Sequence, residues 1–357
     1  PLVTRTVILT LTGLVSRFIG FFYRIFLSNV FGAEGMGLYQ LISPVLALSF
    51  SLTVSGLQTA ISKYVASETS TRDYKNSFRT LWVGFLLAMA LSAVCALGIY
   101  VYAEPIAENL LLEARTAPLL RIIALSIPMA SVHSCINGYF YGIRKTGIPA
   151  FSQLAEQVCR VGSVYLIYFI CQKHGLTPTI SFAVVGLVIG ESASMIVSVV
   201  AIIARAHQVF PAPLFSRRTT TQPFSSVITV YRRITGQLLQ LAVPLSANRL
   251  VLNLLQSVEA IYIPNRLMAY GLSNADALSV YGVLTGMSLP LILFPSAITN
   301  SISVLLLPVV SEADANGNQT AVKRAILTSI RSCLLLGFLC TAMFLLFGRM
   351  AGRLLYS

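Results

Sequence analysis

Long apolar runs alternate with short polar segments along the whole chain. Each run has about 18 residues or more, enough for a helix to cross a hydrocarbon layer roughly 30 Å thick. Because a backbone in lipid must satisfy its own hydrogen bonds, we predict that every run is an α-helix. The pattern predicts nine membrane-spanning helices, at residues 6–31, 37–67, 79–102, 118–141, 149–171, 179–204, 234–261, 277–310 and 319–347. The predicted fold is an all-α polytopic membrane protein.

The longest polar segment separates six predicted helices from the last three. It covers residues 205–233 and contains three prolines and five arginines, a composition typical of a linker. We expect a six-helix N-terminal lobe at 1–207, a cytoplasmic linker at 208–233 and a partial C-terminal lobe of three helices at 234–357.

The last three predicted helices resemble a second copy of the first three. The segment VASE ends at Glu68, and the similar VVSE ends at Glu312. The second helix of each copy is long and broken, at Pro44 and Gly56 or at Pro290 and Pro295. Two six-helix repeats would give at least twelve helices, in parallel repeats related by an axis along the membrane normal. The chain stops after nine and begins with Pro, so we expect a fragment; a complete nine-helix protein is the alternative.

Composition agrees with a membrane location. Hydrophobic residues make up 56% of the chain, charged residues 10%, and the mean hydropathy is +0.79, outside the range of soluble domains. Most Lys and Arg of the polar segments lie on the side of the N-terminus, which the positive-inside rule places in the cytoplasm. The net charge of +13 is therefore a topology signal, and we expect no nucleic-acid partner.

The sequence contains no recognised catalytic or cofactor motif. The six cysteines are scattered singly without metal-type spacing, which favours buried hydrophobic positions. Neither a phosphate-binding G-x-x-x-x-G-K-[ST] loop nor an H-E-x-x-H motif occurs. We expect no enzyme activity, no metal and no cofactor.

Two arginines interrupt the first apolar run. On a helix they share one small, polar stripe, made of Thr10, Gly13, Arg17, Gly20, Arg24 and Ser28. An arginine at the bilayer centre costs at least about 2.5 to 3.5 kcal/mol, and no acid lies within one turn of either. They either snorkel to an interface, pair with acids of other helices, or line a water-filled cavity that attracts an anion. Guanidinium suits phosphate because its planar fork donates two parallel hydrogen bonds.

Cations outnumber acids within the predicted helices. Apart from Arg79, Lys323 and Arg324 at the cytoplasmic helix ends, the cations are Arg17, Arg24, Lys63, Arg121, Arg160, Arg249 and Arg331, and the acids are Glu156, Glu191 and Glu259. Glu156 and Arg160 are spaced i, i+4, which predicts an ion pair within one helix. The excess of cations favours an anionic substrate.

Further polar residues are candidates for the cavity wall. The seventh helix has a second polar stripe, made of Ser246, Arg249, Asn253 and Gln256. His133 and Asn137, one turn apart, predict either a hydrogen-bonded packing pair or a contact with a proton or substrate. Two G-x-x-x-G patterns, at Gly186/Gly190 and Gly282/Gly286, favour close helix packing. The candidate cavity residues are Ser16, Asn253, Gln256, His133, Asn137, Glu156, Arg160 and Glu191, beside the anion-binding candidates Arg17, Arg24 and Arg249.

Five segments in order resemble the stage V sporulation protein B family of the multidrug/oligosaccharidyl-lipid/polysaccharide exporter superfamily. They are SRFIGFFYR, GAEGMGLYQLISP, SGLQTAISKYVASE, GYFYGIRKTGIPAFSQLAEQVCRV and LPLILFPSAITNSISVLLLPVVSEA. The resemblance implies a two-lobe helical bundle of the MATE and MurJ type, with an incomplete second lobe here. In the related lipid II flippases, a Ser-Arg pair and a further arginine of the first helix face the central cavity, and Ser16, Arg17 and Arg24 match them. Arginines that those flippases use in the second and eighth helices have no counterpart here.

The resemblance implies a flippase of the bacterial cell membrane. Such a protein moves a lipid-linked saccharide, of the undecaprenyl-pyrophosphate type used for cell wall, spore cortex or surface polysaccharide, by alternating access. The broken second and eighth helices would act as gates. We expect the lipid-linked oligosaccharide and membrane lipids as partners, with H⁺ or Na⁺ as candidate coupling ions. The alternatives are a multidrug or cation antiporter, which needs an acid such as Glu191 or Glu259, and a non-transporting scaffold for wall synthesis.

Overall fold

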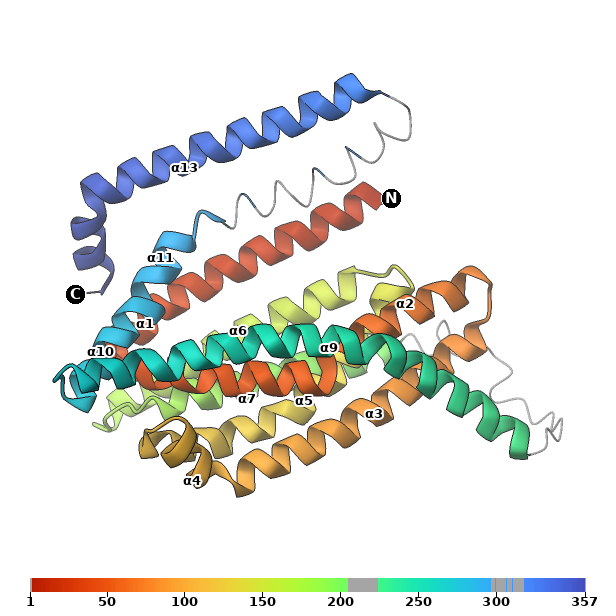
Figure 1. Cartoon of the computed structure of the whole chain (residues 1–357), viewed down its shortest axis with the longest axis horizontal. Helices are drawn as coiled ribbons and strands as arrows, with labels where there is room; N and C mark the ends of the chain where they lie inside the picture. Colours follow the sequence, from red (N-terminus) through yellow and green to blue (C-terminus); the bar gives the residue numbers. More distant parts are fainter. Residues whose placement is uncertain are drawn as a thin grey trace. The chain divides into compact units, whose positions relative to one another are not determined.

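The chain folds into helices. The structure is a computed structural model that describes residues 2–204, 224–296, 299, 306, 310 and 318–356, and all regular structure in these residues is helical (Figure 1). Eight helices of the described part are long and apolar enough to cross a membrane. The first of them, Leu11–Ser70, contains a non-helical Gly32 (φ 70°, ψ −179°). It therefore covers both of the first two predicted spans, and the prediction of an all-α polytopic fold is confirmed.

The helices follow the predicted hydrophobic runs. They are α1 (Leu2–Phe50), the π-helix η1 (Ser51–Ser55), α2 (Gly56–Ser70), α3 (Tyr74–Val101), α4 (Ala103–Pro105), the π-helix η2 (Ile106–Leu110), the 3₁₀-helix η3 (Ala114–Thr116), α5 (Ala117–Gly142), α6 (Gly147–Lys173), α7 (Ser181–Ala204), α9 (Phe224–Ala269), α10 (Asn274–Gly282), the π-helix η5 (Val283–Ser288), α11 (Leu289–Leu293) and α13 (Gln319–Tyr356). Both helices predicted to be broken, the second and the eighth, contain a π-helical segment, a distortion frequently found at functional sites.

The predicted boundaries need two corrections. The helix α9 begins at Phe224 instead of residue 234, so the predicted linker is partly helical, and its residues 208–223 lie outside the described residues. The helix α13 continues to Tyr356, beyond the predicted end at 347. The VVSE motif, which ends at Glu312, also lies outside the described residues.

Residues 1–37 and 278–357 form one compact unit. A Cβ atom built on Gly282 would lie 2.1 Å from the carbonyl oxygen of Ala33, and one built on Gly37 would lie 2.2 Å from the carbonyl oxygen of Leu278. Two glycines therefore let α1 and α10 cross backbone against backbone. Further along, the Phe294 ring packs on Phe21 and holds α1 beside the end of α11, with ring centroids 4.6 Å apart.

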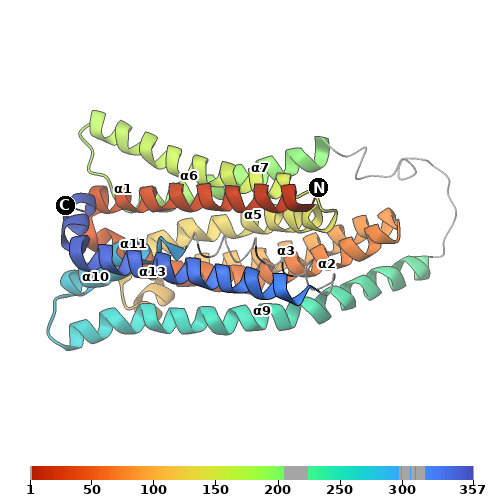
Figure 2. The ribbon, with the colours of Figure 1, turned by 90° about the horizontal axis from the view of Figure 1, so that it is seen from above.

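Residues 38–277 form a second compact unit. Its centre is α5, which packs against α2, α3 and α7, and α7 lies beside α6 (Figure 2). Buried side chains of α2, α3, α5 and α9 form one apolar core, with Phe140 and Leu238 fully buried in it. Contacts thus group α9 with α2 and α3, and the predicted lobes at 1–207 and 234–357 stay a prediction.

The loop before α5 is fixed by an ion pair. Glu113 accepts hydrogen bonds from the side chain and the backbone of Arg115, with its Oε1 2.7 Å from Nε of Arg115. Burial alone would raise the pKa of Glu113, but the hydrogen bonds and the charge of Arg115 outweigh burial and lower this pKa below its usual value. The carboxylate also ends the loop as the N-terminal cap of η3.

Candidate functional site

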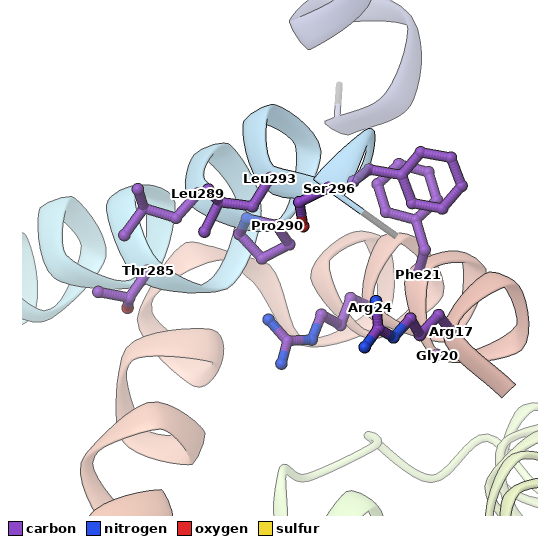
Figure 3. Close-up of a pocket in the computed structure, with 10 residues that line it drawn as sticks. Arg17, Gly20, Phe21, Arg24, Thr285, Leu289, Pro290, Leu293 and Ser296 are labelled. Atoms are coloured by element: carbon purple, nitrogen blue, oxygen red, sulfur yellow. The ribbon is translucent and has the colours of Figure 1, made fainter. Parts of the chain in front are cut away.

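A cationic pocket lies between α1 and the broken helix that follows α10. Its volume is about 540 Å³, and it is lined by Arg17, Gly20, Phe21 and Arg24 of α1 and by Thr285, Leu289, Pro290, Leu293, Phe294 and Ser296 (Figure 3). The two arginines lie on the same side of α1, two turns apart, which is about 10.5 Å along the axis. The structure thus brings Arg17 and Arg24 together as their spacing predicts.

Both guanidinium groups are exposed on this pocket. Neither Arg17 nor Arg24 forms an ion pair with a described residue, and no acid is among the residues that line the pocket. Beside them, Ser16 is buried, and its Oγ has no hydrogen-bond partner among the described residues. Within the described part of the chain, the pocket therefore presents positive charge and hydrogen-bond donors without an anion to neutralise them.

The pocket also contains hydroxyl groups that sequence reasoning did not include. Thr285 and Ser296 come from the helix that was predicted only as a gate. The Thr285 hydroxyl donates to the Tyr281 carbonyl within its own helix, at 2.7 Å. The available signal was the break in this helix, because Pro290 in a membrane helix indicates irregular backbone beside a cavity.

The second predicted wall, on α9, belongs to the other compact unit. Arg249 and Gln256 are exposed there, and their place in a cavity stays a prediction. Asn253 has a different role: its Nδ2 donates to the carbonyl of Ala47, at 3.1 Å, and to the Oγ of Ser51. Asn253 thus joins α9 to the end of α1, at Ala47, and to the start of η1, at Ser51.

A buried polar cluster joins α5, α6 and α7. Arg160 and Glu156 form the predicted ion pair within α6, and Arg160 also reaches Glu191 of α7, at 3.5 Å. The Nε2 of His133 lies 2.7 Å from Oε2 of Glu191. His133 therefore pairs across two helices and not with Asn137. The predicted His133–Asn137 packing pair is wrong, because Nε2 of His133 is bonded to Glu191 and its Nδ1 has no hydrogen-bond partner among the described residues.

Small residues make this cluster possible. A Cβ on Gly190 would lie 2.9 Å from the Glu156 carbonyl oxygen and 3.0 Å from the Cβ of Arg160. One turn earlier, a Cβ on Gly186 would overlap the Val164 side chain, at 2.2 Å. The absence of these side chains lets α7 approach α6 closely, as the G-x-x-x-G pattern predicted.

A row of hydroxyl groups continues the cluster by one turn. The Oγ of Ser152 lies 2.7 Å from that of Ser194 and 3.0 Å from that of Ser198. Ser198 in turn donates to the Oδ1 of Asn137, at 3.4 Å. These side chains are buried, so Asn137 is a packing residue within the bundle.

The cluster contains a possible set of metal ligands. Ligand atoms of His133, Glu156 and Glu191 all lie within 4.8 Å of one another. Arg160, however, already contacts both carboxylates, and its guanidinium supplies the positive charge that a metal would bring.

One of the cations counted within the predicted helices, Arg121, has a partner outside them. It forms an ion pair with Glu104 of α4, with a distance of 2.8 Å between Nη2 and Oε1.

Comparison with known proteins finds relatives that match almost the whole chain. Stage V sporulation protein B of Bacillus subtilis (strain 168) is 29% identical over 355 residues, which are 99% of this chain and 66% of that protein. Lipid II flippase MurJ of the same organism is 23% identical over 346 residues, 94% of this chain and 62% of that protein. The chain thus spans less than two thirds of the length of these relatives.

Two solved structures share the fold. An inward-facing multidrug resistance MATE family transporter of the MOP superfamily has a TM-score of 0.61 at 16% identity, over 95% of this chain and 72% of that one. A MOP superfamily transporter from Pyrococcus furiosus has a TM-score of 0.58 at 16% identity, over 100% of this chain and 75% of that one. These likenesses confirm the MATE-type fold class. A family model described as polysaccharide biosynthesis protein matches residues 2–314, and the chain belongs to that family.

Proposed function

We propose that this protein moves a lipid-linked saccharide with a phosphate-containing headgroup from the inner to the outer leaflet of the bacterial cell membrane, with its N-terminus in the cytoplasm. No covalent bond is made or broken in this function. The observation that carries the proposal is the pocket at α1, where Arg17 and Arg24 face an open space without a carboxylate among the lining residues.

The charge of the pocket favours phosphate over a cationic drug. Two guanidinium groups in a low-dielectric environment attract an anion and repel a cation. Each guanidinium donates up to two parallel hydrogen bonds to phosphate oxygens and stays charged at every physiological pH. The insertion cost of two arginines, roughly 5 to 7 kcal/mol at mid-membrane depth, is compensated only where water or an anion solvates them.

The remaining lining suits the rest of such a substrate. The Ser296 hydroxyl offers a hydrogen bond to sugar hydroxyls, and the Thr285 oxygen, whose proton goes to Tyr281, can accept one. Phe21, Leu289 and Leu293 provide an apolar surface. A volume of about 540 Å³ accommodates a headgroup and not the whole lipid. In the proposed mechanism the isoprenoid tail stays in the membrane, and the π-helices η1 and η5 are the places where the second and eighth predicted helices bend.

The experiment is a leaflet-exchange assay on the full chain in vesicles. The probe is a fluorescent undecaprenyl-pyrophosphate disaccharide, whose exposure to dithionite reports the leaflet. The double variant Arg17→Glu and Arg24→Glu should abolish movement, and Arg17→Gln with Arg24→Gln should reduce it at normal folded yield. A matched control, Arg121→Glu with Arg266→Glu, makes the same charge change outside the pocket and should leave movement unchanged. Unchanged movement in both pocket variants would refute the proposal.

A further inference from the structure

The end of α13 contacts the broken helix beside the cationic pocket. The hydroxyl of Tyr356 donates a hydrogen bond to the Met287 carbonyl of η5, with a distance of 3.1 Å between the two oxygen atoms. Both residues belong to the compact unit that holds the pocket, and the last turns of α13 lie next to this helix in both views (Figure 1, Figure 2). The turns of α13 beyond the predicted end at residue 347 are those that bring Tyr356 to η5.

The contact lies where the backbone of a membrane helix needs an additional donor. The segment η5 is π-helical, and α11, which follows it, has Pro290 in its first turn. Because proline has no N–H, the carbonyls of the preceding turn have one backbone donor fewer than in a regular helix. An unsatisfied carbonyl is costly away from water, and Met287 is only 6% exposed. A hydroxyl from another helix therefore stabilises this distorted turn in one defined conformation.

The same turn carries part of the pocket wall. Thr285 and Leu289, two positions before and two positions after Met287, line the pocket together with Arg24 of α1 (Figure 3). The backbone conformation at Met287 therefore decides how these two side chains face Arg24. Tyr356 also has an electrostatic interaction with Arg24, so its phenol group lies near the guanidinium group as well as the Met287 carbonyl.

We propose that Tyr356 is a positioning residue for the headgroup: by holding η5 through the Met287 carbonyl, it keeps the pocket wall of η5 and α11 in place opposite Arg24. This inference rests on the proposed function, because the headgroup is that of the proposed substrate. Tyr356 is not among the residues that line the pocket, so it acts through η5 and does not bind the headgroup itself.

A purely structural role for Tyr356 makes a different prediction. If the hydroxyl only fastened α13, its loss would lower the stability of the protein and would weaken the binding of every lipid to the same extent. A positioning role lowers the binding of a pyrophosphate lipid alone, because undecaprenol has no charged headgroup to position. A neutral hydrogen bond corresponds to a change of about 2- to 10-fold in an equilibrium constant, and we expect a loss of this size.

The first measurement is the hydrogen bond itself, by infrared spectroscopy of the full chain in nanodiscs with ¹³C-labelled methionine carbonyls. The chain has eight methionines, and the band that is missing in Met287→Leu identifies the Met287 carbonyl. In Tyr356→Phe, which removes only the hydroxyl, this band should move to higher frequency, because the carbonyl loses a hydrogen bond. Tyr270→Phe is the matched control: Tyr270 is 89% exposed, and its substitution should leave the band in place.

The second measurement compares the binding of undecaprenyl pyrophosphate and undecaprenol to the full chain by native mass spectrometry. Tyr356→Phe should lower the preference for the pyrophosphate about 2- to 10-fold, with undecaprenol binding and folded yield unchanged. Tyr270→Phe should keep the wild-type preference. The residue p-aminophenylalanine in place of Tyr356 puts an N–H donor where the hydroxyl was, and it should restore most of the preference.

The inference fails on any of the following results. A Met287 band that does not move in Tyr356→Phe would show that the hydroxyl does not hold η5. An unchanged preference in Tyr356→Phe, or an equal loss of both lipids, would show that Tyr356 has no positioning role, while the proposed function would still stand on the wild-type preference. A wild type without any preference would instead refute the proposed function, and the positioning role with it.

Discussion

The crossing of α1 and α10 gives a sharp test of the structure, through the substitution Gly282→Ala. The added Cβ would lie 2.1 Å from the Ala33 carbonyl oxygen and 2.6 Å from the backbone nitrogen of Gly37. Ordinary contacts of a Cβ begin near 3.4 Å, so the two helices must separate by about 1 Å. Both obstructing atoms belong to backbone, and no side-chain rotation can relieve the overlap.

The magnitude follows from two opposed terms. Overpacking of this kind costs about 1 to 3 kcal/mol, and occasionally more. Replacing glycine by alanine inside a helix raises the free energy of unfolding by up to about 1 kcal/mol, because alanine has the higher helix propensity. Because the overlap is at the severe end of the range, we expect a net destabilisation of about 2 kcal/mol, or roughly a 30-fold change in the unfolding equilibrium. The pocket should also weaken, since Thr285 lies one turn beyond Gly282.

The assay is thermal inactivation of the purified chain in detergent, followed by size-exclusion chromatography. Gly337→Ala is the matched control, because this glycine lies in the middle of α13 and a Cβ there meets nothing within 4 Å. We expect the control to be as stable as the wild type or slightly more stable. Equal melting temperatures for Gly282→Ala and Gly337→Ala would refute the close crossing of α1 and α10.

Two further predictions concern the other compact unit. Ser152→Ala removes the hydroxyl that bonds Ser194 and Ser198, and it should destabilise the protein by about 0.6 to 1.7 kcal/mol in a denaturation assay; an unchanged midpoint would contradict this hydroxyl row. Arg115 lowers the pKa of Glu113 in the folded protein. The ionised carboxylate therefore stabilises the fold fully at pH values above the pKa that Glu113 has in the unfolded chain. This stabilisation is lost as the pH falls through the lower pKa of the folded state. Glu113→Gln should therefore be less stable than wild type at pH 7, with a difference that disappears in acid; a difference independent of pH would contradict it.

Much of the fold follows from the sequence because lipid imposes a simple rule on it. Apolar runs long enough to span the membrane must be helices, and this rule located every described span. The stripe on the first helix was also predictable, since Arg17 and Arg24 share a face through local periodicity alone. The break between the first two helices was predicted at residues 32–36, and the structure has it at Gly32, where φ is 70°.

Pairings between distant segments were beyond local reasoning. His133 and Glu191 are 58 positions apart, and only the packing of α5 on α7 brings them together. A usable signal did exist, because buried acids in membrane helices need partners, and Gly186 and Gly190 just before Glu191 indicate a close helix contact. Asn253 shows the opposite case: it lies on the predicted polar stripe, but its amide fastens α9 to η1.

The central claim is that Arg17 and Arg24 of α1 bind a phosphate headgroup. The most direct test measures, by native mass spectrometry, how undecaprenyl pyrophosphate and undecaprenol bind to the full chain. The two lipids share a tail and differ in charge. A charge-assisted hydrogen bond contributes about 1.5 to 3 kcal/mol, so each arginine should contribute roughly 10- to 100-fold in affinity. We predict that the wild type prefers the pyrophosphate and that Arg17→Gln with Arg24→Gln binds both lipids equally. An undiminished preference in the double variant would contradict the claim.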